Sequence, residues 1–177
     1  MKLVIIIAFY LLCAQSVFSQ NDTLSVCEKL IRIDADSARG KYNLSSREDI
    51  IISKDGKDVI KFVFLEIDKV IIVHIDAVGG GDCVDETNKI TINFRDGSKL
   101  QMPNNGRFNC DGEFSLFFNG GYGNKKELNL FKTKEIEYVK VETRKSLIDK
   151  TRKNFAEANI PSEKSKLIMQ VMDCLDY

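Results

Sequence analysis

The sequence predicts a mainly β fold of the α+β class: an antiparallel β-sandwich or partly closed barrel with a C-terminal α-helix packed on it. Three observations predict this class. Several short segments have the apolar pattern of β-strands, and Asp-Gly dipeptides separate two pairs of these segments. Residues 162–175 carry apolar side chains at helical spacing. Two antiparallel layers and a covering helix are a common solution for elements of this kind.

The first hairpin is expected at Asp55-Gly56, and a tight connection at Ile67-Asp68 follows it. The middles of the second and third strands in this region are apolar on both faces, so we expect both faces to be covered. The strands expected here are 50–53, 59–66 and 70–78.

The second hairpin has the clearest alternation of the chain. A two-residue loop at Asp96-Gly97 would place Ile92 opposite Gln101 and mix the two faces. A three-residue loop with a left-handed Gly97 instead pairs Ile92 with Leu100 and Ile90 with Met102. We favour this register, because a slip of one residue would turn every apolar side chain to the wrong face.

The remaining elements follow from the same signals. Residues 144–160 fit either a helix or a strand, and we favour a strand before Pro161. The last element is a helix with Ser162 as its N-cap, because Ile168, Val171, Met172 and Leu175 lie on one face. Further strands are expected at 30–33, 114–118 and 136–141, and a turn at 120–123.

Residues 1–19 have the pattern of a secretory signal peptide. Lys2 precedes an apolar run, and Val17 and Ser19 occupy the positions of a small-residue cleavage site. The run is too short to span a membrane. We therefore expect an exported protein, in the periplasm, on the outer-membrane surface or secreted, whose mature chain of residues 20–177 is a single disulfide-stabilised domain without a transmembrane segment.

The charge balance of this mature chain is close to neutral. Removing residues 1–19 takes Lys2 from the 26 basic side chains and leaves 25, against 26 acidic ones. The charges of both signs are mixed along the sequence. This balance gives no electrostatic reason to expect nucleic acid as a partner.

Cysteine usage agrees with export. Without Cys13 of the signal peptide, four of the five cysteines remain, an even number that predicts two disulfides in an oxidising compartment. Cys83 and Cys110 lie almost symmetrically about the Asp96-Gly97 hairpin, which favours bonds Cys83–Cys110 and Cys27–Cys174. The pairing of Cys27 with Cys83 and of Cys110 with Cys174 remains open.

The acidic segment beside Cys83 offers candidate oxygen ligands for Ca²⁺. These candidates are Asp82, Asp85 and Glu86, and a Cys83–Cys110 bond would bring Asp111 and Glu113 toward them. They lack the regular spacing and fixed glycine of an EF-hand loop. The sequence therefore favours a solvated acidic loop, and we predict no metal and no cofactor.

No residue is predicted to be catalytic. His74 is the only histidine, and no nucleophile-elbow sequence accompanies it, so we interpret it as a partly buried strand residue bonded to a neighbour. The glycine-rich segments 79–82 and 120–126 lack a Walker motif, and neither clearly opens a helix. If one of these loops binds a ligand, Tyr122 and Lys125 are the candidate contacts.

Four short pieces resemble small secreted, strand-rich proteins of uncharacterised function from Gram-negative bacteria of the Bacteroidota type. The resemblance spans roughly residues 83–177, and it implies a strand-rich body closed by a C-terminal helix, with a strand at 152–160. It carries over no catalytic residue. The pieces are Phe94-Arg95-Asp96-Gly97-Ser98, Phe108-Asn109-Cys110-Asp111-Gly112, 130–136 and Cys174-Leu175.

These observations favour a non-catalytic interaction or binding module of the cell envelope. Its partner would be a protein, a glycan or a small apolar ligand. The first alternative is a carrier that holds a small apolar ligand in a lipocalin-like barrel. The second is a hydrolase with its site on the acidic loop.

Overall fold

The structure is a computed structural model that describes residues 25–36, 41–55, 57–77, 83–144 and 153–176. The predicted signal peptide and Asp82 lie outside these ranges. The described elements are α2 (Val26–Leu30), β1 (Ile31–Asp36), β2 (Lys41–Ser46), β3 (Ile50–Lys54), β4 (Lys57–Ile67), β5 (Val70–Asp76), β6 (Lys89–Phe94), β7 (Lys99–Pro103), β8 (Glu113–Asn119), α3 (Lys125–Thr133), β9 (Ile136–Glu142), β10 (Phe155–Asn159) and α4 (Ser162–Leu175).

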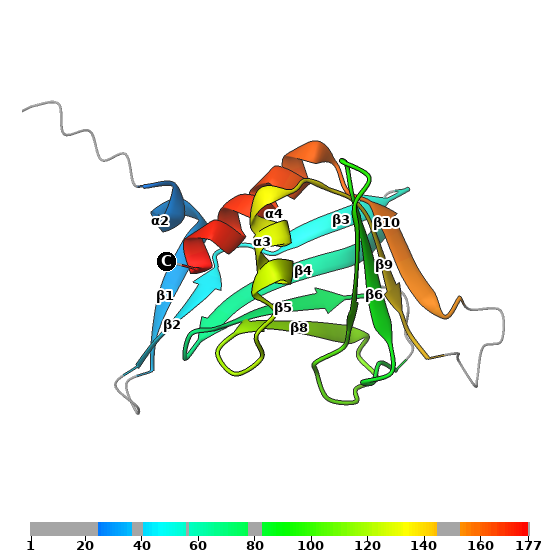
Figure 1. The fold of residues 1–177 in the computed structure, drawn as a ribbon, viewed down its shortest axis with the longest axis horizontal. Coiled ribbons are helices and arrows are strands. Elements are labelled where there is room, and N and C mark those ends of the chain that lie inside the picture. The colour runs from blue at the N-terminus through cyan, green and yellow to red at the C-terminus, as the bar shows by residue number, and fades with distance from the viewer. Residues whose placement is uncertain (1–24, 37–40, 56, 78–82, 145–152, 177) are drawn as a thin grey trace, which may run out of the picture.

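The strands form two antiparallel sheets, as the sequence predicts. The first has the order β1-β2-β4-β5-β8, with β3 also paired to β4, and the second has the order β10-β9-β6-β7. Helix α4 lies across the inner face of the first sheet and contacts the second sheet at β9 (Figure 1). The described strands stay in two open sheets and do not close into a barrel, so the sandwich alternative is the one confirmed.

One apolar core fills the space between the sheets and α4. The inward residues of β4, β5 and β8 are buried because their side chains alternate across the pleat. Helix α4 contributes the predicted stripe, since Ile168, Val171, Met172 and Leu175 are all buried. The inward aromatic side chains of both sheets are fully buried with that of α3: Phe62, Phe64, Phe94, Phe114, Phe118 and Phe131.

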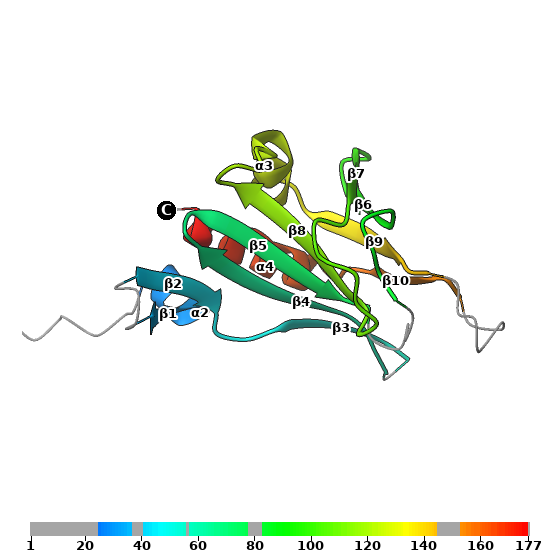
Figure 2. The ribbon, with the colours of Figure 1, turned by 90° about the horizontal axis from the view of Figure 1, so that it is seen from below.

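The outer face of the first sheet differs from expectation. We expected both faces of β4 and β5 to be covered, but the outward Val63, Leu65 and Ile72 remain partly exposed. Figure 2 shows β4, β5 and β8 in front of α4, with their outer face toward the viewer. Apolar cross-strand neighbours, such as Leu65 opposite Ile72 and Ile72 opposite Phe117, shield one another on this face.

The structure confirms the register predicted for the Asp96-Gly97 hairpin. Ile92 pairs with Leu100 and Ile90 with Met102, and Gly97 has a left-handed φ of 83°. The β4–β5 turn lies one residue later than predicted, because Ile67 still pairs with Val70. Asp68 and Lys69 form the loop with φ of 52° and 66°, a two-residue turn suited to strand twist.

Two local predictions were wrong, and one helix lies where no element was predicted. The strand expected at 30–33 is present as β1, and residues 26–30 before it form α2, because Ser25 and Glu28 make a reciprocal capping box. Segment 120–126 does open a helix, the unpredicted α3. Ser162 is the first residue of α4 rather than its N-cap, since its hydroxyl donates to Glu135 Oε2 at 2.7 Å.

Asparagine side chains cover the outward edge of β8. Asn104 Oδ1 accepts the backbone N–H of Ser115 at 2.8 Å, and Asn105 Oδ1 accepts that of Phe117 at 3.2 Å. Asn124 Nδ2 donates to the Phe117 carbonyl at 2.9 Å. These amides supply bonds that a neighbouring strand would otherwise make.

Both favoured disulfides are present. Cys27–Cys174 ties α2 to the end of α4 across a sequence separation of 147, and Cys83–Cys110 spans a separation of 27. Among the described helices, none has both the length and the apolar character that crossing a bilayer requires.

The two disulfides should differ in their effect on stability. The chain-entropy model gives about 5 kcal/mol for a loop as long as Cys27–Cys174 and about 3.5 kcal/mol for Cys83–Cys110. We therefore expect C27A/C174A to lower the free energy of unfolding more than C83A/C110A, measured by urea denaturation without reductant. An equal or larger loss in C83A/C110A would contradict this expectation.

Candidate functional site

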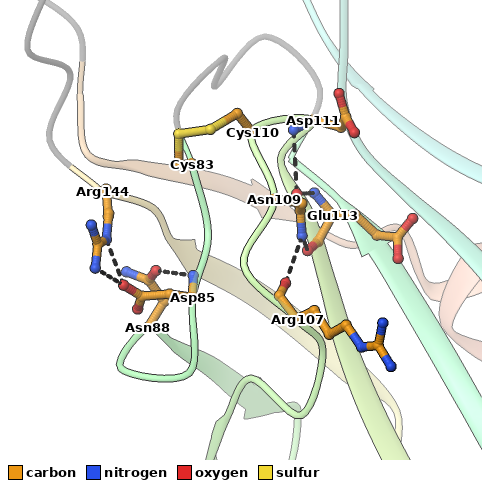
Figure 3. The surroundings of a disulfide bond; sticks show 9 residues. All are labelled: Cys83, Asp85, Asn88, Arg107, Asn109, Cys110, Asp111, Glu113 and Arg144. Atoms are coloured by element: carbon orange, nitrogen blue, oxygen red, sulfur yellow. Dashed lines mark hydrogen bonds and ion pairs between the residues drawn. A yellow bond between two sulfur atoms is a disulfide. The ribbon is translucent and has the colours of Figure 1, made fainter.

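The Cys83–Cys110 bond joins the segment before β6 to the segment before β8 (Figure 3). Val84 and Asn109 form an isolated antiparallel bridge beside it, with N–O distances of 2.8 and 3.0 Å. The Asn109 side chain then organises the turn, because its Oδ1 accepts the Glu113 N–H and its Nδ2 donates to the Glu113 carbonyl. The loop is thus held by covalent and backbone contacts.

Asp85, one of the candidate calcium ligands, is buried and fully engaged by protein donors. Its Oδ1 accepts the Thr87 N–H at 2.9 Å and the Thr87 hydroxyl at 2.6 Å, and its Oδ2 pairs with the Arg144 guanidinium. The Thr87 hydroxyl, with further help from Arg144, lowers the pKa of Asp85 below its ordinary value. Neither oxygen is left to bind a cation without breaking these contacts.

The other acidic candidates do not gather around Asp85. Figure 3 shows Asp85 turned toward Arg144, whereas Asp111 and Glu113 lie on the other side of the disulfide. Glu86 is exposed at the surface. Within the described residues, no group of three or more His, Cys, Asp or Glu is placed to hold a metal ion. The disulfide forms as predicted, but it does not bring the carboxylates together.

His74 makes the kind of contact that the sequence favours. Its Nδ1 lies 2.9 Å from Ser115 Oγ and 3.0 Å from Glu113 Oε1. A Ser-His-acid triad needs the serine and the acid on opposite ring nitrogens, whereas here both partners share one. Ser115 is only 2% exposed, so its hydroxyl is closed to a substrate. His74 therefore links β5 to β8 as a structural residue.

A hollow lies at the end of the first sheet where the C-terminus is marked in Figure 1. We call it the end cleft, and its volume is about 790 Å³. Strand β2, the β4–β5 hairpin, the end of β8, helix α3 and the end of α4 supply its lining residues: Leu44, Glu66, Lys69, Ile71, Asn119, Gly120, Lys125, Leu128, Asn129, Lys132, Leu175 and Asp176.

Apolar side chains from four of these elements contribute to the end cleft. They are Leu44, Ile71, Leu128 and Leu175, and the last three are almost fully buried. Helix α3 contributes one complete face, because its lining residues 125, 128, 129 and 132 recur at helical spacing. An apolar part surrounded by a few polar groups is typical of small-molecule sites.

Two acidic side chains of the cleft are engaged by neighbours. Lys132 Nζ lies 3.0 Å from Asp176 and 3.2 Å from Asp173, and its bond to Asp176 raises the pKa of Lys132. Asn119 Nδ2 also donates to Asp176 at 2.8 Å. Glu66 Oε1 accepts the backbone N–H of Lys69 at 2.5 Å.

The structure separates the two ligand-loop candidates. Lys125 lines the end cleft, whereas Tyr122 packs edge-to-face on Phe117 with ring centroids 4.9 Å apart and lies outside the lining. Lys69 and Lys125 form no ion pair with a carboxylate among the described residues. Sequence reasoning missed Leu44, Lys69 and Lys132; only the helical spacing from 125 to 132 could have signalled part of this site.

A second hollow, of about 640 Å³, lies beside the Cys27–Cys174 disulfide. Ile31, Ile33 and Leu44 give it an apolar lining, and Glu28 and Arg47 are its charged residues. Leu44 lines both this hollow and the end cleft. One apolar side chain of β2 thus borders both hollows.

Comparisons with protein-family models, with curated proteins and with solved structures found no significant match.

The contacts of the buried Asp85 carboxylate with Thr87 and with the exposed Arg144 should make stability depend on pH. Because the folded-state pKa of Asp85 is lowered from 3.8, its contribution is complete above that value and is lost as the pH falls through the folded value. We expect D85N to be less stable than wild type at pH 7, with a difference that shrinks below about pH 3.8, in urea denaturation at several pH values.

The matched control is D111N, which changes an exposed carboxylate of the same loop. At pH 7 it should stay within about 0.5 kcal/mol of wild type. A D85N deficit that is the same at pH 7 and at pH 2 would show that the charge of Asp85 is not what stabilises the loop.

Proposed function

We propose that this chain is an exported, non-catalytic binding module of the cell envelope, and that the end cleft is its ligand site. Export is supported by the signal-like residues 1–19 and by the two disulfides, which are typical of oxidising compartments.

The end cleft is the observation that carries the proposal. Its volume of about 790 Å³ lies within the range of small-ligand sites. Two contacts hold the elements around the cleft. The Cys27–Cys174 bond anchors the end of α4, and Lys132 of α3 pairs with Asp173 and Asp176, which lie on either side of Cys174 in the sequence. A site that is already formed loses little entropy when a ligand binds.

The side chains that were considered as catalytic or metal-binding residues make structural contacts instead. The Asp85 carboxylate holds Arg144 and Thr87, the His74 ring bridges β5 and β8, and all four described cysteines are oxidised. These contacts favour binding over turnover, and they remove the support for a hydrolase site on the acidic loop.

The carrier of a small apolar ligand remains a second candidate, and the apolar residues of the end cleft favour it. Its ligand would not lie inside a lipocalin-like barrel, because the inward phenylalanines are fully buried against one another and against α4. It would lie in the open end cleft, between β2 and α3.

A neutral fluorescent probe tests whether the end cleft binds. We expect N-phenyl-1-naphthylamine to bind at one site per chain with increased fluorescence, because its rings can leave water for the apolar part of the cleft. N129W places an indole in the cleft from an exposed position of α3 and should weaken probe binding at least tenfold.

The matched control is K126W, which adds the same side chain at an exposed position of α3 outside the lining. It should bind the probe as wild type does, and circular dichroism should show both variants folded. If wild type does not bind the probe, or if both tryptophan variants bind it equally, the end cleft is not the site.

A further inference from the structure

We infer that the end cleft takes a single-chain amphiphile with an anionic head group, and that Lys69 and Lys125 bind the head. This inference rests on the proposed function, and it adds the chemical class of the ligand. It follows from three features of the described residues: the net positive charge of the cleft lining, the placement of the two lysines, and the apolar residues that line the cleft and the second hollow.

The first feature is the imbalance of available charge. Asp176 is bound by Lys132 and Asn119, and Glu66 accepts the Lys69 N–H. The ammonium groups of Lys69 and Lys125 have no carboxylate partner among the described residues. The lining of the cleft thus holds three lysines, at 69, 125 and 132, against two carboxylates, and its net charge is positive.

The second feature is that the two lysines come from separate, well-held elements. Lys69 lies in the two-residue turn between β4 and β5, where its backbone N–H is bonded to Glu66. Lys125 is the first residue of α3, and Asn124 before it donates to the Phe117 carbonyl. Both lysines line one cleft, and we place there a single anionic group that meets both ammonium groups.

The third feature is the apolar surface available to a tail. The partly exposed Leu44 lines both the end cleft and the second hollow, whereas Ile71, Leu128 and Leu175 line the cleft with little exposed surface. Ile33, which lines the second hollow, is 68% exposed. An alkyl chain that crosses Leu44 would reach this exposed apolar surface, and each methylene that it buries should strengthen binding about fourfold.

A lysine ammonium acts as a point charge, so the lysines select charge rather than head-group shape. A carboxylate is therefore a suitable probe of the class. The free amphiphile and an anionic lipid in a bilayer share this chemistry. We propose the free amphiphile, because both the head and the tail would be held inside hollows of the chain.

Displacement of N-phenyl-1-naphthylamine by two amphiphiles of opposite charge and similar chain length tests the inference, below their micellar concentrations at pH 7.4. We expect decanoate to displace the probe at least tenfold more effectively than decyltrimethylammonium. The preference should decrease in high salt, because salt screens exposed charges. Octanoate should bind about 16-fold more weakly than decanoate if the whole tail is buried.

The variant K69Q/K125Q should bind decanoate about tenfold more weakly and bind the neutral probe unchanged. Its matched control is K89Q/K99Q, which removes two exposed lysines from the second sheet and should leave both affinities unchanged. Far-ultraviolet circular dichroism and thermal unfolding should confirm that both double variants are folded.

The outcomes separate this inference from the proposed function. If the probe binds wild type but decanoate has no advantage over the cation, or K69Q/K125Q keeps its decanoate affinity, the ligand class is wrong and the site stands. If the probe does not bind wild type, the site itself is wrong. Binding to phosphatidylglycerol vesicles without displacement by free decanoate would overturn the inference in favour of a membrane surface.

Discussion

The packing of α4 between the two sheets is the contact on which the remaining structure depends. Its apolar face closes the core of the first sheet, and its Ser165 hydroxyl accepts the Ile136 N–H at 2.6 Å in the second. The end of the same helix supplies Leu175 to the end cleft and Cys174 to the disulfide with α2. One element thus sets the position of both sheets, the N-terminal segment and the candidate site. Burial of its stripe drives this arrangement, because a helix of this length gains most of its stability from packing.

Periodic signals made the body of the fold predictable from sequence. Alternation and the Asp96-Gly97 turn were enough to assign the Ile92–Leu100 register, and the helical stripe was enough to assign α4. Helix α3 escaped prediction because it is short and follows glycines that equally suit a turn. The end cleft could not be predicted, since residues 44, 69, 125 and 175 meet only through the tertiary packing. We expected the apolar outer face of β4 and β5 to be covered. The sequence shows that its residues are apolar, but it does not show whether another element packs against them.

The acidic loop and the end cleft show how the same residue types take opposite roles. Asp85 is held by donors from two segments, and the Cys83–Cys110 bond fixes the loop in which it lies. The charge of Asp85 is matched within the protein, which favours rigidity. Lys69 and Lys125 instead stand at the mouth of a hollow with no matching carboxylate among the described residues. An unmatched charge beside apolar surface has more to gain from an external partner than one already paired, since the paired one must first lose its contacts.

The asparagine amides along β8 have a consequence for the chain before its disulfides have formed. An open sheet offers its edge to any extended segment, including another copy of the same chain. At β8 the side chains of Asn104, Asn105 and Asn124 already occupy the backbone groups of that edge, and they come from segments close to it in sequence. None of these side chains takes part in a disulfide. These contacts would therefore protect the chain against strand-to-strand aggregation at this edge before its cysteines are oxidised.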